Sequence, residues 1–204
     1  MDALKAIINH ISKFVDLTDE EIKAYTSIAR ITKVRKKQFI VQPGFVCKYK
    51  SYIFEGVLRS YLIDTGGQDH TILIGIEDWW ISDYASFIFQ EPATLFVEAL
   101  EDSILVQIDH NAEQQLLREY PKFEHFLRIS WERGLAYSQK RVLTNLSKSA
   151  EARYDDFLER YPKIVQRVPQ YVIASYLGIS RELLSKIRHG KVHKNRKTSH
   201  EVLK

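Results

Sequence analysis

The sequence predicts an α+β protein that joins an N-terminal antiparallel β-barrel, or jelly roll, to a long helix and a C-terminal helix-turn-helix domain of the winged-helix kind. Three observations predict this class. Short apolar segments separated by turns fill residues 30–108, as in small antiparallel barrels. Apolar residues then recur at helical spacing over about 27 residues. Finally, two short segments with helical apolar stripes flank a glycine between residues 168 and 188.

The first 29 residues are expected to form two helices. Apolar residues recur at helical spacing from Leu4 to Phe14. A second helix should begin after Thr18, because Glu21 follows three residues later in the arrangement of a capping box.

Turns define the strands of the predicted barrel. Residues 64–67 (Asp-Thr-Gly-Gly) read as a hairpin turn between strands at 57–63 and 70–74. Other strands are expected near 49–54, 94–100 and 103–108, with a short loop or helix between residues 82 and 90.

The long helix follows Pro121 and is apolar on more than one side. Such a helix needs two packing partners. One face can cover the barrel, and the other can pair with the same helix of a second chain, where Gly134 would allow close approach. Burial of the second face within a monomer is the alternative. The residues predicted at the dimer interface are Phe126, Trp131, Gly134, Tyr137 and Ser138.

The segment 168–188 reads as a helix-turn-helix. Gly178 can end the first helix in the left-handed conformation, and Ser180 can cap the second. Leu183, Leu184 and Ile187 are expected to face inward, which leaves the polar residues outward for a DNA major groove. An ordinary helical hairpin in a core is the alternative. The predicted DNA contacts are Gln170, Ser180, Arg181, Glu182, Ser185, Lys186 and Arg188.

Composition limits the other classes of function. The 204-residue chain is 45% hydrophobic with a net charge of +4, as in ordinary globular proteins. After Arg160 the acidic residues are only Glu182 and Glu201, so the C-terminal part is strongly basic and suits double-stranded DNA. Neither a signal peptide nor a membrane-spanning run is recognisable, which predicts a cytoplasmic protein with no membrane partner.

Nothing in the sequence indicates an enzyme, a metal site or a resident cofactor. Cys47 is the only cysteine, so one chain can form neither a disulfide nor a cysteine-ligated cluster. Glu77, Asp78 and Asp83 form a local acidic cluster without a histidine at ligand spacing, and we interpret it as a solvated loop.

Taken together, these parts resemble the Crp/Fnr superfamily of bacterial transcription factors, whose members include the cyclic-AMP receptor protein. The resemblance is most specific in residues 179–187 (Ile-Ser-Arg-Glu-Leu-Leu-Ser-Lys-Ile), in the spacing from Ala174 to Gly178, and in residues 98–102 (Glu-Ala-Leu-Glu-Asp). Residues 149–154 and 168–179 look like the compact branch common in Bacteroidetes-type bacteria. The resemblance implies a cyclic-nucleotide-binding-like effector domain at 1–110, a dimerisation helix and hinge at 111–148, and a DNA-binding domain at 149–204.

The resemblance implies a homodimer that reads a roughly palindromic site, with Arg181 and Glu182 contacting base edges. The family's nucleotide site does not carry over. Ser82-Asp83 stand where nucleotide-binding members have Gly-Glu, and Ala93-Thr94 stand where they have Arg-Ser or Arg-Thr. Without the arginine, a buried phosphate lacks its counter-charge. We therefore expect an unidentified small-molecule effector rather than cyclic AMP; the alternative is a cyclic-nucleotide or other small-molecule sensor with little sequence-specific DNA binding. The candidate effector-pocket residues are Arg59, Tyr61, Ser82, Asp83, Tyr84 and Thr94.

Overall fold

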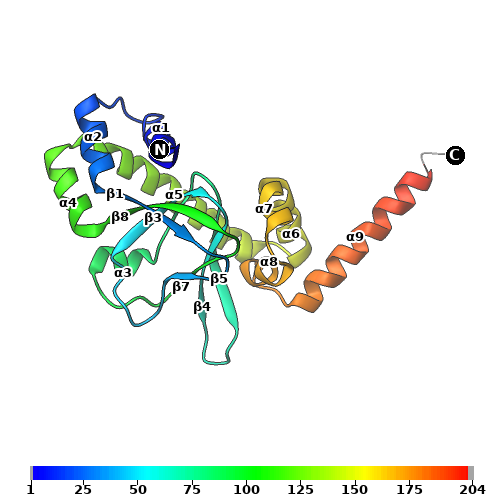
Figure 1. The fold of residues 1–204 in the computed structure, drawn as a ribbon. Helices are drawn as coiled ribbons and strands as arrows, with labels where there is room; N and C mark the ends of the chain where they lie inside the picture. The colour runs from blue at the N-terminus through cyan, green and yellow to red at the C-terminus, as the bar shows by residue number, and fades with distance from the viewer. Residues whose placement is uncertain (1, 202–204) are drawn as a thin grey trace. The chain divides into compact units, whose positions relative to one another are not determined.

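The computed structural model describes the backbone of residues 2–201 and the side chains of residues 2–191. Contacts divide the chain into two compact units, Met1–Lys140 and Arg141–Lys204 (Figure 1). The first unit contains all the strands of the described chain, and the second is helical. The three-part division at residues 110 and 148 remains a prediction.

The first unit is built on two four-stranded antiparallel sheets. One has the strand order β1-β8-β3-β6, and the other has the order β2-β7-β4-β5. The strands are β1 (Ala29–Val34), β2 (Phe39–Val41), β3 (Tyr49–Glu55), β4 (Leu58–Ile63), β5 (Asp69–Gly75), β6 (Trp80–Ile81), β7 (Phe96–Ala99) and β8 (Ser103–Asp109). The jelly-roll prediction is confirmed as an open sandwich of two sheets rather than as a closed barrel.

Local sequence signals place the helices of the first unit. They are α1 (Asp2–Ile11), α2 (Asp19–Ile28), α3 (Tyr84–Phe89), α4 (His110–Glu119) and α5 (Lys122–Ser147), the last of which continues into the second unit. The capping box of α2 forms as predicted, because the Thr18 hydroxyl accepts from the Glu21 N–H while the Glu21 carboxylate accepts from the Thr18 N–H. Asp109 likewise caps α4 with its side chain.

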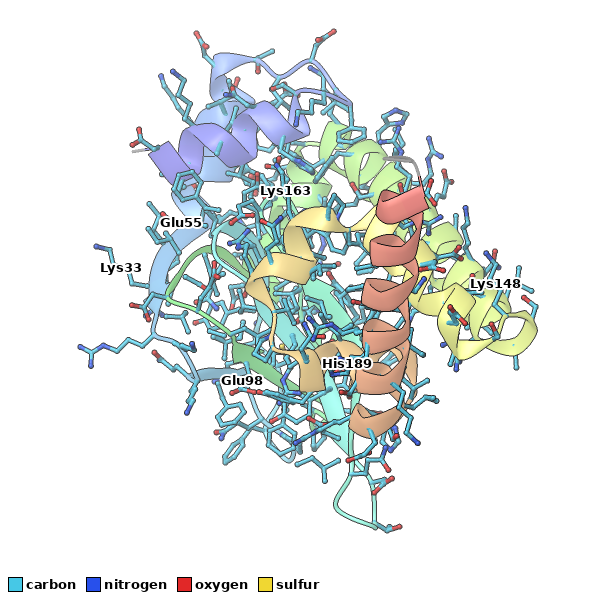
Figure 2. The ribbon with its side chains drawn as sticks, turned by 90° about the vertical axis from the view of Figure 1, so that its right-hand side faces the viewer. Lys33, Glu55, Glu98, Lys148, Lys163 and His189 are labelled. Carbon is cyan, nitrogen blue, oxygen red and sulfur yellow. The ribbon has the colours of Figure 1, made fainter. Side chains whose placement is uncertain are left out.

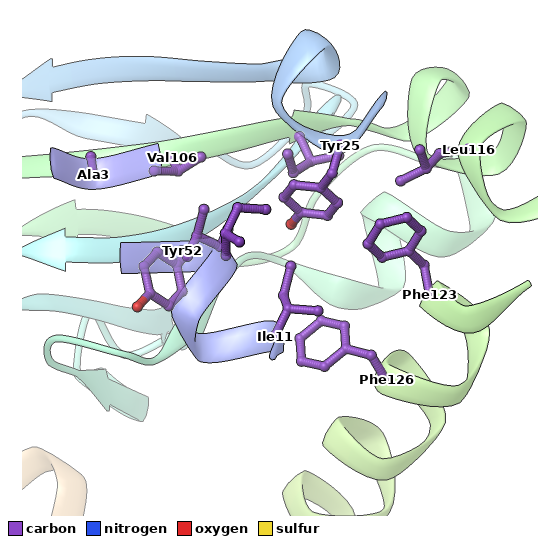
Figure 3. Packing of buried hydrophobic residues seen from close by; sticks show 11 residues of the cluster. Ala3, Ile11, Tyr25, Tyr52, Val106, Leu116, Phe123 and Phe126 are labelled. Atoms are coloured by element: carbon purple, nitrogen blue, oxygen red, sulfur yellow. The ribbon is translucent and has the colours of Figure 1, made fainter. Parts of the chain in front are cut away.

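An aromatic core joins these helices to the first sheet (Figure 3). Tyr52 on β3 is fully buried, and its ring lies 5.4 Å from His10 of α1. Phe123 and Phe126 of α5 are each 1% exposed, and Phe123 packs 5.2 Å from Tyr25 of α2. The first turns of α5 are thereby fixed to the first unit.

A buried ion pair crosses the same region. Lys50 of β3 and Glu113 of α4 form a salt bridge with only 4% and 8% of their side chains exposed. The ammonium also lies 4.7 Å from the centre of the Trp80 ring. Burial lowers the pKa of Lys50, and the Glu113 carboxylate opposes this effect.

The second unit packs four further helices around an apolar core. They are α6 (Ala150–Arg160), α7 (Pro162–Arg167), α8 (Gln170–Leu177) and α9 (Arg181–Glu201). The core includes Tyr154, Phe157, Ile164, Ile173 and Leu184. The backbone of α9 stays helical through Gly190 to Glu201, so the described residues form no strand where a winged helix would have its hairpin.

Candidate functional site

The helix-turn-helix of the second unit is built by the two residues that the sequence singled out. Gly178 has a φ of 64° and ends α8, donating its N–H to the carbonyl groups of Ala174 and Ser175. Two residues later the Ser180 hydroxyl accepts from the Leu183 N–H at 3.1 Å and caps α9. The turn between the helices is therefore three residues long and fixed at both ends.

The start of α9 presents a continuous polar face. Arg181, Ser185 and Arg188 are separated by four and three residues and lie on one side of the helix. Glu182 and Lys186 lie about 100° further round and widen the face. His189, labelled in Figure 2, follows Ser185 by four residues and Lys186 by three, so it extends this face further along α9. The residues of the face, all exposed, are Arg181, Glu182, Ser185, Lys186 and Arg188.

Neighbouring groups orient the first two side chains of this face. The Arg181 guanidinium lies over the ring of Tyr171 on α8, 5.0 Å from its centre. The Glu182 backbone N–H, followed by the Ser180 hydroxyl, holds the pKa of the Glu182 carboxyl below its usual value, so this carboxylate is ionised at neutral pH. Gln170 at the start of α8 is half-buried, and its Oε1 lacks a hydrogen-bond partner. The sequence contains no signal for the role of Tyr171, because helical periodicity describes contacts within one helix and not a contact from α8 to α9 across the turn.

One inward-facing prediction for α9 is wrong. Leu184 is 1% exposed and belongs to the core, but Leu183 is 41% exposed. Adjacent residues on a helix are separated by about 100°, so the two leucines cannot both face a core contacted along one side of α9.

The predicted dimer face of α5 also needs correction. Phe126 is unavailable to a second chain because it lies in the core of the first unit, where its ring is 5.7 Å from Phe14. Trp131 is 41% exposed and packs edge-on against Tyr84 at 4.6 Å. Gly134 has open space where a Cβ would stand, while Tyr137 and Ser138 are exposed.

A stripe of exposed apolar residues continues along α5. Trp131, Leu135, Val142 and Leu146 are separated by four, seven and four residues, so they share one side of the helix. Their exposed fractions are 41%, 61%, 54% and 81%, in chain order. We refer to these four residues as the α5 stripe; Ser138 lies within it, whereas Tyr137 points to a different side of α5.

Asp83 is the most constrained residue of the candidate effector pocket. It is 2% exposed and caps α3. One carboxylate oxygen accepts from the Ser86 N–H at 3.1 Å, and the other accepts from the N–H groups of Thr94 and Leu95, each at 2.9 Å. Burial disfavours the charged form, but these backbone donors outweigh it and hold the pKa of Asp83 below its usual value.

The chain's own carboxylate therefore fills a nest of backbone N–H groups, the kind of site that binds an anion. Ser82 and Tyr84 are the neighbours of Asp83 in the chain, and they leave its carboxylate buried. The Ser82 hydroxyl donates to the Tyr49 carbonyl at 3.2 Å and lies 3.1 Å from the Cys47 sulfur.

Arg59 and Tyr61 lie on the other sheet and form a separate group. The Arg59 guanidinium, which is 5% exposed, pairs with Asp69 at 2.7 Å and with Glu98 (labelled in Figure 2) at 3.1 Å. It also lies 3.9 Å from the centre of the Tyr61 ring. This arginine is already neutralised by two carboxylates, so it does not supply the counter-charge that the missing arginine at position 93 would have given.

The interpretation of the acidic cluster as a solvated loop holds only in part, because Asp78 is exposed in a turn and Glu77 is half-buried there, whereas Asp83 is buried. Besides Asp83, Asp78 accepts from the Tyr52 hydroxyl at 2.5 Å, and Glu77 accepts from the Gly56 N–H at 3.1 Å. These carboxylates hold turns and strands together. Among residues 2–191, no group of three or more His, Cys, Asp or Glu side chains is placed to hold a metal ion.

A shallow hollow of about 270 Å³ lies elsewhere in the first unit, along β2 and the segment that follows it. None of the predicted effector-pocket residues lines it. Its walls include Phe39, Val41, Phe45, Cys47 and Tyr49.

Comparisons with known proteins agree with this architecture. No family model matches the chain. The regulatory protein HlyX of Actinobacillus pleuropneumoniae is 25% identical over 185 residues, which cover 84% of this chain and 75% of HlyX. The global regulator CLP of Xanthomonas campestris, described as responsive to c-di-GMP, superimposes with a TM-score of 0.73 at 12% identity, covering 87% of this chain and 93% of CLP.

A protein of Eubacterium rectale, described as a transcriptional regulator of the Crp/Fnr family, superimposes with a TM-score of 0.71 at 18% identity. The match covers 91% of this chain and 88% of the Eubacterium rectale chain. The chain has the Crp/Fnr fold. The predicted resemblance is thereby confirmed, while the assignment to a Bacteroidetes-type branch remains a prediction. The similar proteins that carry this fold are regulators. Among the residues that the structure describes, none of the helices has the length and apolar character needed to cross a membrane.

Proposed function

We propose that the chain is a homodimeric transcription regulator of the Crp/Fnr type that binds a roughly palindromic DNA site through the first turns of α9. It acts on double-stranded DNA in the cytoplasm and catalyses no reaction. The exposed polar face that begins at Arg181 carries the proposal, because a core hairpin would bury that face. An Arg fork suits guanine and a Glu carboxylate suits cytosine N4, which are the base edges open in a major groove.

Several features support the rest of this interface. The half-buried Gln170 and the capped start of α9 lie at helix N-termini, where side-chain and backbone donors can hold phosphates. Ser185, Lys186 and Arg188 continue the polar face and supply the contacts that position the helix. Two such helices on a two-fold axis would enter major grooves roughly 34 Å apart.

Replacing Arg181 by Ala is expected to weaken specific binding by about 1–3 kcal/mol and to relax the preference at one base pair of each half-site. Selection of bound duplexes from a random pool, followed by titration of the best site and its single-base variants, measures both effects. Replacing the exposed Arg188 by Ala is the matched control, because a residue that only positions the helix on phosphates should lower the affinity for all sequences uniformly. An unchanged base preference in the Arg181 variant would remove Arg181 from the reading surface.

We further propose that this regulator does not use a cyclic nucleotide as its effector. The buried Asp83 carboxylate already occupies the N–H groups of Ser86, Thr94 and Leu95, and a cyclic phosphate brought there would meet a like charge. The candidates for an effector site remain Arg59, Tyr61, Ser82, Asp83, Tyr84 and Thr94, and the part of it around Asp83 suits a neutral ligand better than an anion.

The alternative is a small-molecule sensor whose helix-turn-helix has little sequence preference. Calorimetric titration with cyclic AMP and cyclic GMP separates the two proposals. We expect no stoichiometric heat with either nucleotide, whereas clear one-to-one binding together with a random outcome of the DNA selection would favour the alternative.

A further inference from the structure

Arg141 connects the α5 helix to the helix-turn-helix inside the second unit. Its Nη2 donates to the carbonyl of Tyr176 at 2.9 Å. Its guanidinium lies over the Tyr176 ring, 4.1 Å from the ring centre. Both contacts go to the last turn of α8, where a helix leaves carbonyl groups without partners and where its dipole attracts positive charge.

Tyr176 also packs against aromatic residues of the second unit. Its ring lies 5.4 Å from Phe157 of α6, and Phe157 lies 5.5 Å from Tyr161. Phe157 is 3% exposed, and Tyr176 is half-buried. The guanidinium therefore rests on a packed aromatic column rather than on a mobile surface side chain. A cation over an aromatic face is held most strongly when water is excluded in this way.

The Arg141–Tyr176 contact lies directly before the turn that leads into α9. Tyr176 stands two residues before Gly178, and the Ser180 cap starts α9 immediately after the turn. Arg141 stands on α5 next to Val142, a member of the α5 stripe. The same short piece of α5 thus carries both the exposed apolar face and the side chain that fixes the end of α8.

We propose that Arg141 is a positioning residue that sets the distance and angle between the two DNA-reading helices of the dimer, and thereby selects the spacing of the two half-sites. This inference rests on the proposed function. In that function, the residues of α9 determine which bases are contacted, and Arg141 determines the separation of the two half-sites that the dimer binds.

Two other contacts near the end of α5 are weaker anchors. Lys148, the residue after the end of α5, pairs with Asp156 at 2.5 Å, but more than 40% of each side chain is exposed. Arg153 donates to the Asn145 carbonyl at 3.4 Å. Exposed ion pairs contribute little and exchange readily with water, so neither contact would hold α8 to α5 as Arg141 does.

The test measures binding to duplexes that carry two copies of the selected half-site, with their separation varied one base pair at a time around ten. With the wild-type chain, one base pair away from the optimum should weaken binding by about tenfold, and Arg141→Met should reduce this penalty to about threefold or less. The selected half-site sequence should stay the same, because the exposed face of α9 is untouched. Arg141→Lys keeps the charge but not the planar stack, and it should give an intermediate profile.

Arg133→Met is the matched control. Arg133 lies on the same helix and stacks on Phe14 at 4.8 Å within the first unit, so its loss should leave the spacing profile unchanged. A wild-type profile in both Arg141 variants, measured on folded dimers, would overturn the inference. A wild-type chain that selects no half-site at all would instead overturn the proposed function, and the two failures are therefore distinct.

Discussion

Replacing Glu113 by Ala is expected to lower the free energy of unfolding of the first unit by about 3–5 kcal/mol. The Lys50–Glu113 pair is buried on both sides, and removing the carboxylate leaves an ammonium group in an apolar environment beside the Trp80 ring. Burial already lowers the pKa of Lys50, and Glu113 is the group that opposes this shift. Equilibrium unfolding in urea, followed by tryptophan fluorescence, measures the loss.

Two further variants make this result specific to the ion pair. Glu119 lies on the same helix, and its exposed carboxylate accepts a hydrogen bond from the Gln115 amide. Replacing Glu119 by Ala should change the free energy of unfolding by no more than about 0.5 kcal/mol. Replacing both partners, with Lys50→Met and Glu113→Leu together, should recover most of the lost stability, because two apolar side chains leave no buried charge unpaired. If the single Glu113 variant is as stable as the Glu119 variant, the pair does not hold β3 to α4.

The parts of this fold that the sequence predicted are those set by neighbouring residues. The capping box at Thr18, the left-handed end of α8 at Gly178 and the cap at Ser180 each depend on residues within four positions of one another. Strand and helix periods likewise reflect local geometry. These signals were enough to predict most of the strands and the helix-turn-helix, but not the order of the strands in the two sheets.

The predictions that were wrong concern contacts between residues distant in the sequence, or neighbouring residues that helical periodicity does not distinguish. Periodicity shows that α5 is apolar on two sides, but it does not say that α1 and Phe14 cover Phe126. It also treats Leu183 and Leu184 alike, although the core reaches only one of them. Asp83 looked like a loop carboxylate because its N–H partners at Thr94 and Leu95 lie eleven and twelve residues further along the chain.

The α5 stripe is the part of the proposed dimer on which the rest depends, because a monomer offers one α9 to the DNA instead of two. Replacing Leu135, which is 61% exposed, by Glu is expected to abolish dimerisation. Burial of a leucine side chain contributes about 1.5–3 kcal/mol, and the change occurs twice in a symmetric dimer, so the dissociation constant should rise by at least about 100-fold. Sedimentation at micromolar concentration measures the shift.

The same variant should also separate dimerisation from base reading. Its affinity for a duplex with two half-sites should fall to that for a single half-site, and the dependence of binding on salt should weaken because fewer phosphates are contacted. Ala136→Glu is the matched control, since Ala136 is exposed one position further along α5 and outside the stripe. A Leu135 variant that still sediments as a dimer would move the interface away from the stripe, and would leave Tyr137, on another side of α5, as the residue to replace next. A monomer that keeps its preference for single half-sites would show that the helix-turn-helix reads DNA independently of the dimer, with α5 supplying only the second copy.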